Sequence, residues 1–174
     1  IALSDQVTID SGKTIILDMN GETLSIGFSD SSKNLIVNNG TLTITGDGTF
    51  DATEATSYKG FINNYGTLTV ENGTFQIADK AMTVHLRNQD GGKAVINGGT
   101  FSGGATIVRS FEGSNTTITG GSFTNSVYPA VDVNGETLIT GGIFTNTSCS
   151  RCDSQNWGYT CLLYTSPSPR DGAT

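Results

Sequence analysis

The stretch GTLTITGDGTF at residues 40–50 returns as GTLTVENGTF at residues 66–75. Three further versions follow: KAVINGGTF at 93–101, NTTITGGSF at 115–123 and ETLITGGIF at 136–144. The phenylalanines that close the phrases are Phe50, Phe75, Phe101, Phe123 and Phe144, at spacings of 25, 26, 22 and 21 residues. A period in this range is typical of a solenoid, in which each repeat forms one coil and buries its apolar face against the next coil.

Each phrase has the same internal order of strand, corner and phenylalanine. Leu42 and Ile44 fall on one face of an extended chain and Thr41 and Thr43 on the other, because side chains alternate along a strand. Glycine pairs at 98–99, 120–121 and 141–142 precede the phenylalanine, and glycine favours tight corners. We therefore expect parallel coils with a buried, stacked ladder formed by the five phenylalanines.

The composition agrees with many short strands. The 174 residues include 23 Gly and only 3 Pro, and 14% of them are charged. No segment carries the i, i+3, i+4, i+7 apolar pattern of a helix, and a β-sandwich seldom repeats one phrase at matched intervals. A net charge of −7 disfavours nucleic acid as a partner. No apolar run approaches the roughly 18 residues of a membrane-spanning helix, so no membrane span is expected.

The repeats resemble the right-handed parallel β-helices of the pectin-lyase-like superfamily, especially the Gly/Thr-rich versions in bacterial surface or secreted proteins. The opening VTIDSGKTIILDMNGETLSI at residues 7–26 is similar to their leading coil. The resemblance covers about residues 5–160 and implies an all-β, single-stranded right-handed parallel β-helix of about six coils of 21–26 residues. It also implies an extracellular or cell-surface location.

The two ends of the chain suggest a fragment. Residues 1–160 are expected to form a β-solenoid domain of a longer protein with further repeats or anchoring domains. Residues 161–174 break the pattern, and the stretch Cys161–Asp171 resembles a translated sequencing adapter, so we expect a non-native, disordered tail. The other interpretation is a genuine Ser/Pro-rich linker. Cys149 and Cys152 have no second ligand pair for zinc, which leaves a local disulfide or two thiols.

Signals for catalysis are weak. The chain has neither an Asp-Asp pair nor a Gly-His-Gly motif, and glycoside hydrolysis on such a scaffold needs clustered carboxylates. Asp47, Asp51 and Glu54 are close in sequence but lack an ordered calcium-ligand spacing, so a solvated loop is the preferred interpretation. No catalytic residue, metal or cofactor is therefore predicted.

One group of polar residues recurs from coil to coil. The offset of 22 that superimposes Ile96 on Ile118 also places Arg87 on Arg109 and Asp90 on Glu112. Strand alternation predicts outward His85, Arg87 and Arg109 side chains. One interpretation is a surface salt-bridge ladder of little energetic value, and the other is a site for an acidic sugar held by guanidinium groups. The candidate ligand-binding residues are His85, Arg87, Asp90, Arg109 and Glu112.

Aromatic residues give a second lead, because exposed rings could stack on sugars or could instead cover apolar ends of the solenoid. They are Tyr58, Tyr65, Tyr128, Trp157 and Tyr159. The function that the sequence favours is non-enzymatic: an adhesive stalk or glycan-contacting surface, with polysaccharide or host glycan as partner. The alternative is a fragment of a polysaccharide lyase or hydrolase whose catalytic coils lie outside this stretch.

Overall fold

A computed structural model describes residues 1–27, 30, 33–53, 60–78, 83–125 and 128–146. These residues form three sheets, and every neighbouring pair of strands in them is parallel. The described residues contain strands and turns and no helix, and thus no helix of the length and apolarity needed to cross a membrane. The predicted parallel β-solenoid is confirmed, while right-handed winding and the number of coils stay predictions.

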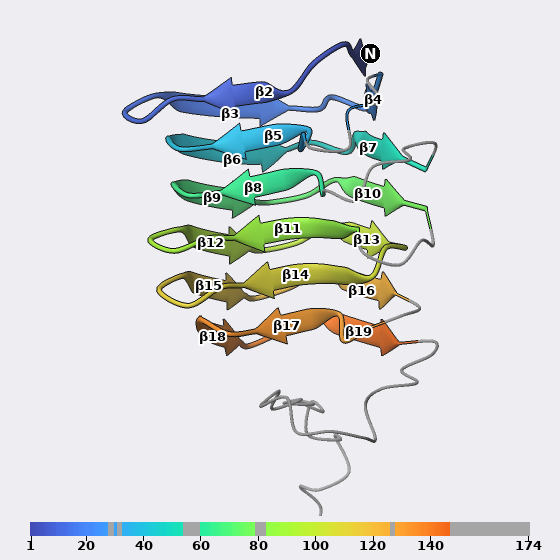
Figure 1. Ribbon diagram of the computed structural model, residues 1–174. Coiled ribbons are helices and arrows are strands. Elements are labelled where there is room, and N and C mark those ends of the chain that lie inside the picture. Colours follow the sequence, from blue (N-terminus) through green and yellow to red (C-terminus); the bar gives the residue numbers. More distant parts are fainter. Residues whose placement is uncertain (28–29, 31–32, 54–59, 79–82, 126–127, 147–174) are drawn as a thin grey trace, which may run out of the picture.

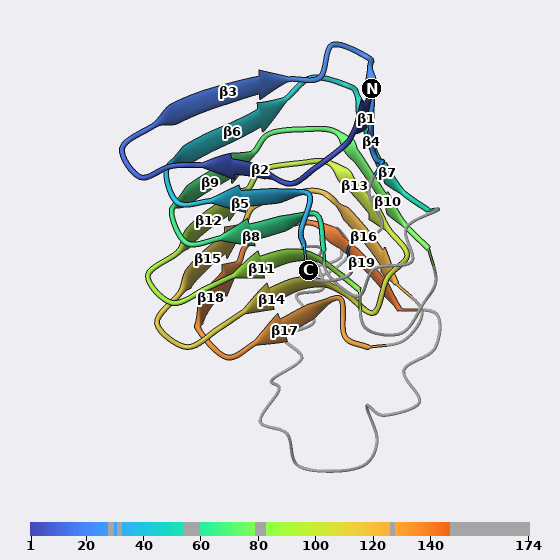
Figure 2. The same cartoon turned by 45° about the horizontal axis from the view of Figure 1, so that its top comes forward.

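The chain visits the three sheets in turn, so that each coil contributes one strand to each (Figures 1 and 2). The first sheet holds β1 (Ala2–Leu3), β4 (Thr23–Ile26), β7 (Thr49–Ala52), β10 (Thr74–Ile77), β13 (Thr100–Ser102), β16 (Ser122–Asn125) and β19 (Ile143–Asn146). The second holds β2 (Val7–Ile9), β5 (Ile36–Asn38), β8 (Ile62–Asn64), β11 (Val84–Asn88), β14 (Thr106–Ser110) and β17 (Val131–Val133). The third holds β3 (Thr14–Asp18), β6 (Thr41–Thr45), β9 (Thr67–Val70), β12 (Lys93–Ile96), β15 (Asn115–Ile118) and β18 (Glu136–Ile139).

The phenylalanine ladder runs along the inside of the first sheet. Successive rings are parallel, with centroids 4.6 to 5.0 Å apart, which is the strand spacing of a sheet. The first four rings are at most 3% exposed, as the sequence predicts. Phe144 differs, because among the described residues it stacks on Phe123 alone, and it is 38% exposed. The prediction that all five rings are buried is therefore wrong for Phe144, the last ring of the described stack.

The glycine pair Gly98–Gly99 joins β12 of the third sheet to β13 of the first sheet. Glycine is required at both positions, for different reasons. Gly99 has a φ of +102°, a left-handed conformation that L residues with a side chain rarely adopt. Gly98 has an ordinary φ, but a Cβ atom there would lie 2.5 Å from the carbonyl oxygen of Glu71 on the preceding coil. The corner thus needs glycine once for the backbone turn and once for the close approach of two coils.

The second sheet carries a buried polar ladder that the sequence analysis did not identify. Asn38 Nδ2 donates to Asn64 Oδ1 at 2.7 Å, and Asn64 Nδ2 donates to Asn88 Oδ1 at 2.8 Å. Asn88 Nδ2 continues to Thr116 Oγ1 at 2.9 Å. The three asparagines are fully buried, and each amide bridges neighbouring coils. Buried polar groups that are satisfied only in one alignment fix the register between coils.

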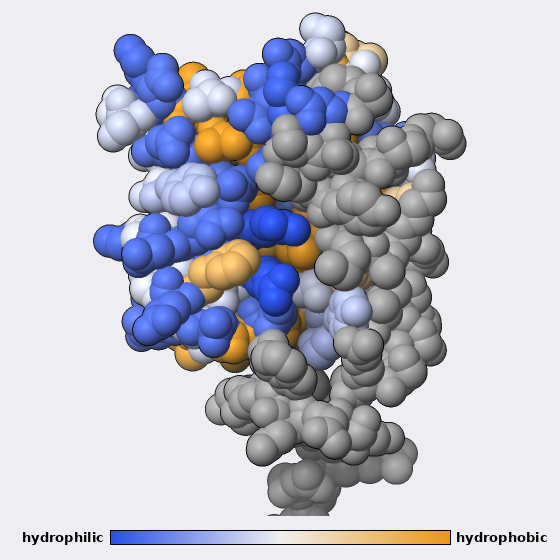
Figure 3. All heavy atoms as spheres, in the orientation of Figure 1, coloured by the Kyte–Doolittle hydropathy of each residue, from blue (hydrophilic) through white to orange (hydrophobic). Residues whose placement is uncertain are grey.

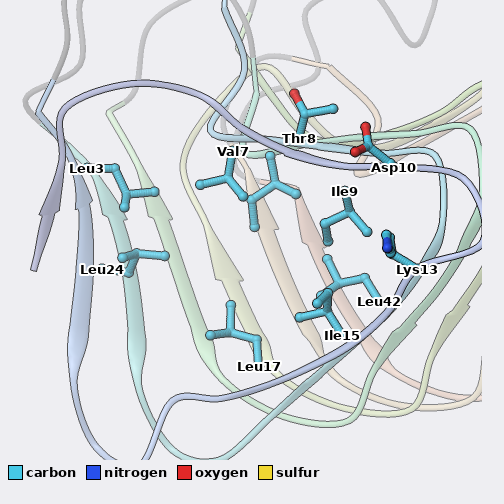
Figure 4. Close-up of a pocket in the computed structure, with 11 residues that line it drawn as sticks. Leu3, Val7, Thr8, Ile9, Asp10, Lys13, Ile15, Leu17, Leu24 and Leu42 are labelled. Atoms are coloured by element: carbon cyan, nitrogen blue, oxygen red, sulfur yellow. The ribbon is translucent and has the colours of Figure 1, made fainter.

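The interior is open at the first coil, where, in the described part of the chain, β2 and β3 have a neighbouring strand on one side only. An apolar hollow of about 360 Å³ lies there. Its lining includes Leu3, Val7, Ile9, Ile15, Leu17 and Leu24, whose side chains lie inside the ring of strands in Figure 4. Val7 is 40% exposed, whereas Leu42 on the next coil is 1% exposed. The hollow is therefore the uncovered end of the apolar core.

Candidate functional site

The outer face of the second sheet carries the candidate site. Four residues occupy equivalent positions on β8, β11, β14 and β17, and each is the Cα partner of the next. This rank of residues consists of Asn63, Arg87, Arg109 and Asp132. These strands form the near face of the stack in Figure 1, and the hydropathy surface over them is largely hydrophilic in Figure 3. The predicted superposition of Arg87 on Arg109 is therefore confirmed.

Arg109 is already paired within this rank. Its Nε lies 2.8 Å from Oδ2 of Asp132 on the adjacent strand. The guanidinium carbon also lies 5.5 Å from the centroid of the Phe111 ring, within the range of a cation–π contact. The side chain of Asp132 is 14% exposed and that of Arg109 is 44% exposed, so the carboxylate of this ion pair is shielded from water while the guanidinium is partly solvated. The charge of Arg109 is thus compensated by one carboxylate.

Arg87 has no such partner. Among the described residues it forms no ion pair, and its Nε is buried without a hydrogen bond. Burial, and then the positive charge of Arg109, lower the pKa of the Arg87 guanidinium from its ordinary value. Arginine nevertheless stays protonated in proteins. Arg87 is therefore a half-buried cation with unused hydrogen-bond donors.

The predicted acidic partners are not the ones that the structure uses. Asp90 and Glu112 are exposed and lie in the turns after β11 and β14. No ion pair in the described part of the chain joins either carboxylate to an arginine. The strand ends at Asn88, and the Gln89 carbonyl accepts a hydrogen bond from Gly92 N as the chain turns. A ladder pairing Asp90 and Glu112 with the arginines is therefore wrong, and the missed partner is Asp132.

His85 lies in the core and not on the outer face. It is 1% exposed, and its ring centroid lies 5.6 Å from that of Phe61 and 6.0 Å from that of Phe101. Nε2 lies 3.1 Å from the carbonyl oxygen of Gly103, so a neutral ring carries its proton on Nε2 and donates it there. Nδ1 has no partner. The prediction of an outward His85 is wrong. His85 is the second residue of β11, and burial does not alternate there, because Val84, His85 and Leu86 are all buried.

Stability should therefore depend on pH through His85. Burial lowers the pKa of His85 from 6.5 to about 4. Between these values the unfolded chain binds a proton that the folded chain does not, so stability falls as pH drops from 6.5 to 4 and is unaffected by this group above 6.5. A shift of this size corresponds to about 3 kcal/mol.

Urea denaturation at several pH values measures this loss. His85→Leu is the matched variant, because a leucine fills the same apolar position and does not titrate. The difference in unfolding free energy between wild type and His85→Leu should change by about 3 kcal/mol over this window. Parallel pH profiles for the two chains would contradict the assignment.

Neutral polar groups extend the site beside Arg87. Gln89 Nε2 donates to Asn63 Oδ1 at 2.6 Å, and Asn63 Nδ2 donates to the hydroxyl oxygen of Tyr65 at 3.3 Å. Tyr65 is 47% exposed, so its ring is accessible from solvent. The sequence analysis missed Asn63 and Gln89, although Asn63 lies one repeat before Arg87.

The other sequence candidates that lie within the described residues give no second site. Asp47 accepts a hydrogen bond from Asn72, and Asp51 accepts two from Thr53. No group of three or more His, Cys, Asp or Glu residues that could hold a metal ion occurs in the described ranges. Tyr128 is partly buried and its backbone bonds to Ala105. The remaining candidates and predicted segments lie outside the described residues: Glu54, Tyr58, Cys149, Cys152, Trp157, Tyr159 and the tail at 161–174.

In comparisons with known proteins, no family model, no curated protein and no solved structure matched the chain significantly. The class of protein is thus defined by the strand pairing itself: an all-parallel, three-sheet β-solenoid. The likeness to the pectin-lyase-like superfamily stays a prediction from the repeat sequences.

Proposed function

We propose that this chain is a non-enzymatic β-solenoid segment of a bacterial cell-surface or secreted protein, acting as an adhesive stalk with a glycan-contacting surface. The observation that carries the proposal is the unbroken register of three parallel sheets through successive coils. A stack of this kind gains length by adding coils, because each coil contacts only its neighbours.

The inside of the stack favours rigidity. The phenylalanine rings and the asparagine amides each bridge one coil to the next, so neighbouring coils are held by both apolar and polar contacts. Bending or shearing the stack would separate rings and break buried hydrogen bonds. Such a rod suits a stalk that holds a binding surface away from a cell.

The outside of the second sheet favours contact with a glycan. Its outward side chains include an unpaired arginine, two amides and an exposed tyrosine ring. Amides and hydroxyls bind sugar hydroxyl groups, and aromatic rings cover the apolar faces of sugars. The surface is open and shallow, so we expect modest affinity at one coil, multiplied by repetition along a longer stalk.

The experiment is to sequence the gene on both sides of this stretch and to express chains with increasing numbers of coils. In the stalk proposal the flanks encode further repeats or an anchor, and particle length in electron micrographs grows by about 4.8 Å per coil. Flanking coils with clustered carboxylates, together with cleavage of a polysaccharide by the longer chain, would overturn the proposal and support the enzyme alternative.

A further inference from the structure

We infer that Arg87 is an oxyanion-binding site, which takes a single carboxylate or sulfate group of an acidic saccharide. The inference rests on the proposed glycan-contacting function and narrows it to one residue and one chemical group. It differs from a site shared by two arginines, because Asp132 withdraws Arg109 from ligand binding.

The first step is the charge along the rank of outward residues. Asn63 is neutral, Arg87 is positive, and Arg109 and Asp132 form a compensated pair at 2.8 Å. One positive charge is therefore left over, and it sits at Arg87. The whole chain has a net charge of −7, so the uncompensated positive charge of Arg87 is opposite in sign to the net charge of the chain.

The second step is the state of the Arg87 side chain. Within the described residues its Nε is buried and has no hydrogen-bond acceptor, so a ligand would reach the guanidinium at its two terminal Nη groups, which are not among the buried unpaired atoms. The guanidinium also faces the like charge of Arg109 at the next position. An oxyanion bound by both Nη groups in the two-pronged manner would offset this repulsion. Arg87 has no carboxylate partner in the described part of the chain, and the ligand would supply one.

The third step is the surrounding chemistry, which favours a saccharide as the carrier of the anion. Asn63 lies on the adjoining coil, and Gln89 follows directly after the strand that carries Arg87. Their amides are hydrogen-bonded to each other. The exposed ring of Tyr65 is joined to this pair through the hydroxyl contact with Asn63. Together they offer groups for sugar hydroxyls and a surface for a sugar ring next to the cation.

The test uses the full chain and three named polymers: hyaluronan oligosaccharide for carboxylate, dextran sulfate for sulfate, and neutral dextran. Binding is measured by isothermal titration calorimetry, and arginine Nε–H resonances are followed by NMR. We expect one or both acidic polymers to bind and to shift the Arg87 resonance, with no binding of neutral dextran. Arg87→Gln should weaken binding by about tenfold or more, because it removes a charge-assisted hydrogen bond.

Two matched variants separate this site from general charge attraction. Arg109→Gln removes the same charge from the adjacent coil and should change affinity by less than about threefold, because Asp132 already compensates Arg109. Asp132→Asn releases Arg109 and should strengthen binding several-fold. Circular dichroism of each variant checks that the fold is kept.

Equal losses in Arg87→Gln and Arg109→Gln, or unchanged binding in Arg87→Gln, would overturn the site. Absence of binding of both acidic polymers to the wild-type chain would also overturn it. The stalk proposal is judged separately, by the flanking gene sequence and by particle length. Carboxylate-only and sulfate-only binding both support the inference, and they identify which oxyanion the surface prefers.

Discussion

Phe101→Ala should lower the free energy of unfolding by about 3–5 kcal/mol, as for other truncations of buried aromatic side chains. The ring is 3% exposed and stacks between Phe75 and Phe123, at centroid distances of 4.6 and 5.0 Å. Removing it leaves a void on both sides, because the rigid stack of coils cannot close around it. Urea denaturation followed by circular dichroism measures the loss.

Phe144→Ala is the matched control, since the same side chain occupies the equivalent place on the last described coil. It stacks on one ring only and is 38% exposed, so its removal should cost less than about 2 kcal/mol. Similar losses for the two variants would contradict an energetic role for stacking from both sides.

Asn64→Ala should also cost about 3–5 kcal/mol, although it removes a polar side chain. Asn64 accepts a hydrogen bond from Asn38 and donates one to Asn88 in the fully buried ladder. The substitution removes one of the two acceptors of Asn38 Nδ2 and the donor to Asn88 Oδ1. It also removes the donor to the carbonyl oxygens of Gly66 and Lys93. Each buried polar group left without a partner costs about 1–3 kcal/mol. The same urea experiment tests this expectation.

The control lies one residue earlier. Asn63→Ala changes the same residue type on the same strand, but the Asn63 side chain faces outward beside Tyr65 and Gln89. Its loss should stay below about 1 kcal/mol, because water can replace its partners. Equal losses for Asn63→Ala and Asn64→Ala would show that the buried ladder contributes nothing beyond ordinary surface hydrogen bonds.

The fold was predictable because the strongest signals in the sequence are local and repeated. The position of phenylalanine after each glycine corner defines where coils superimpose, and the pairing of Phe75 with Phe50 and Phe101 follows that alignment. The asparagine ladder was missed, because asparagine is common in turns and rare in strands, so Asn38 and Asn64 gave no signal of burial. Their burial depends on partners 26 and 24 residues away.

The site was predictable only in part, for two physical reasons. Strand alternation predicted an outward His85, but the first three residues of β11 are all buried, so alternation fails at the start of this strand. The acidic partner of Arg109 was sought in the following turn, at Glu112. It lies instead on the next strand, at Asp132, because cross-strand neighbours are closer than residues beyond a strand end. Register between coils decides charge pairing here.

The unequal spacing of the repeats has a consequence for how such a chain can evolve. The connection from β7 to β8 runs from Ala52 to Ile62, whereas that from β13 to β14 runs only from Ser102 to Thr106. The sheets on either side nevertheless keep their pairing. Residues can therefore be inserted or deleted in the connections from the first sheet to the second without changing the packing of the core. Natural variation, and any peptide grafted by design, can enter there while the rest of the coil keeps its alignment.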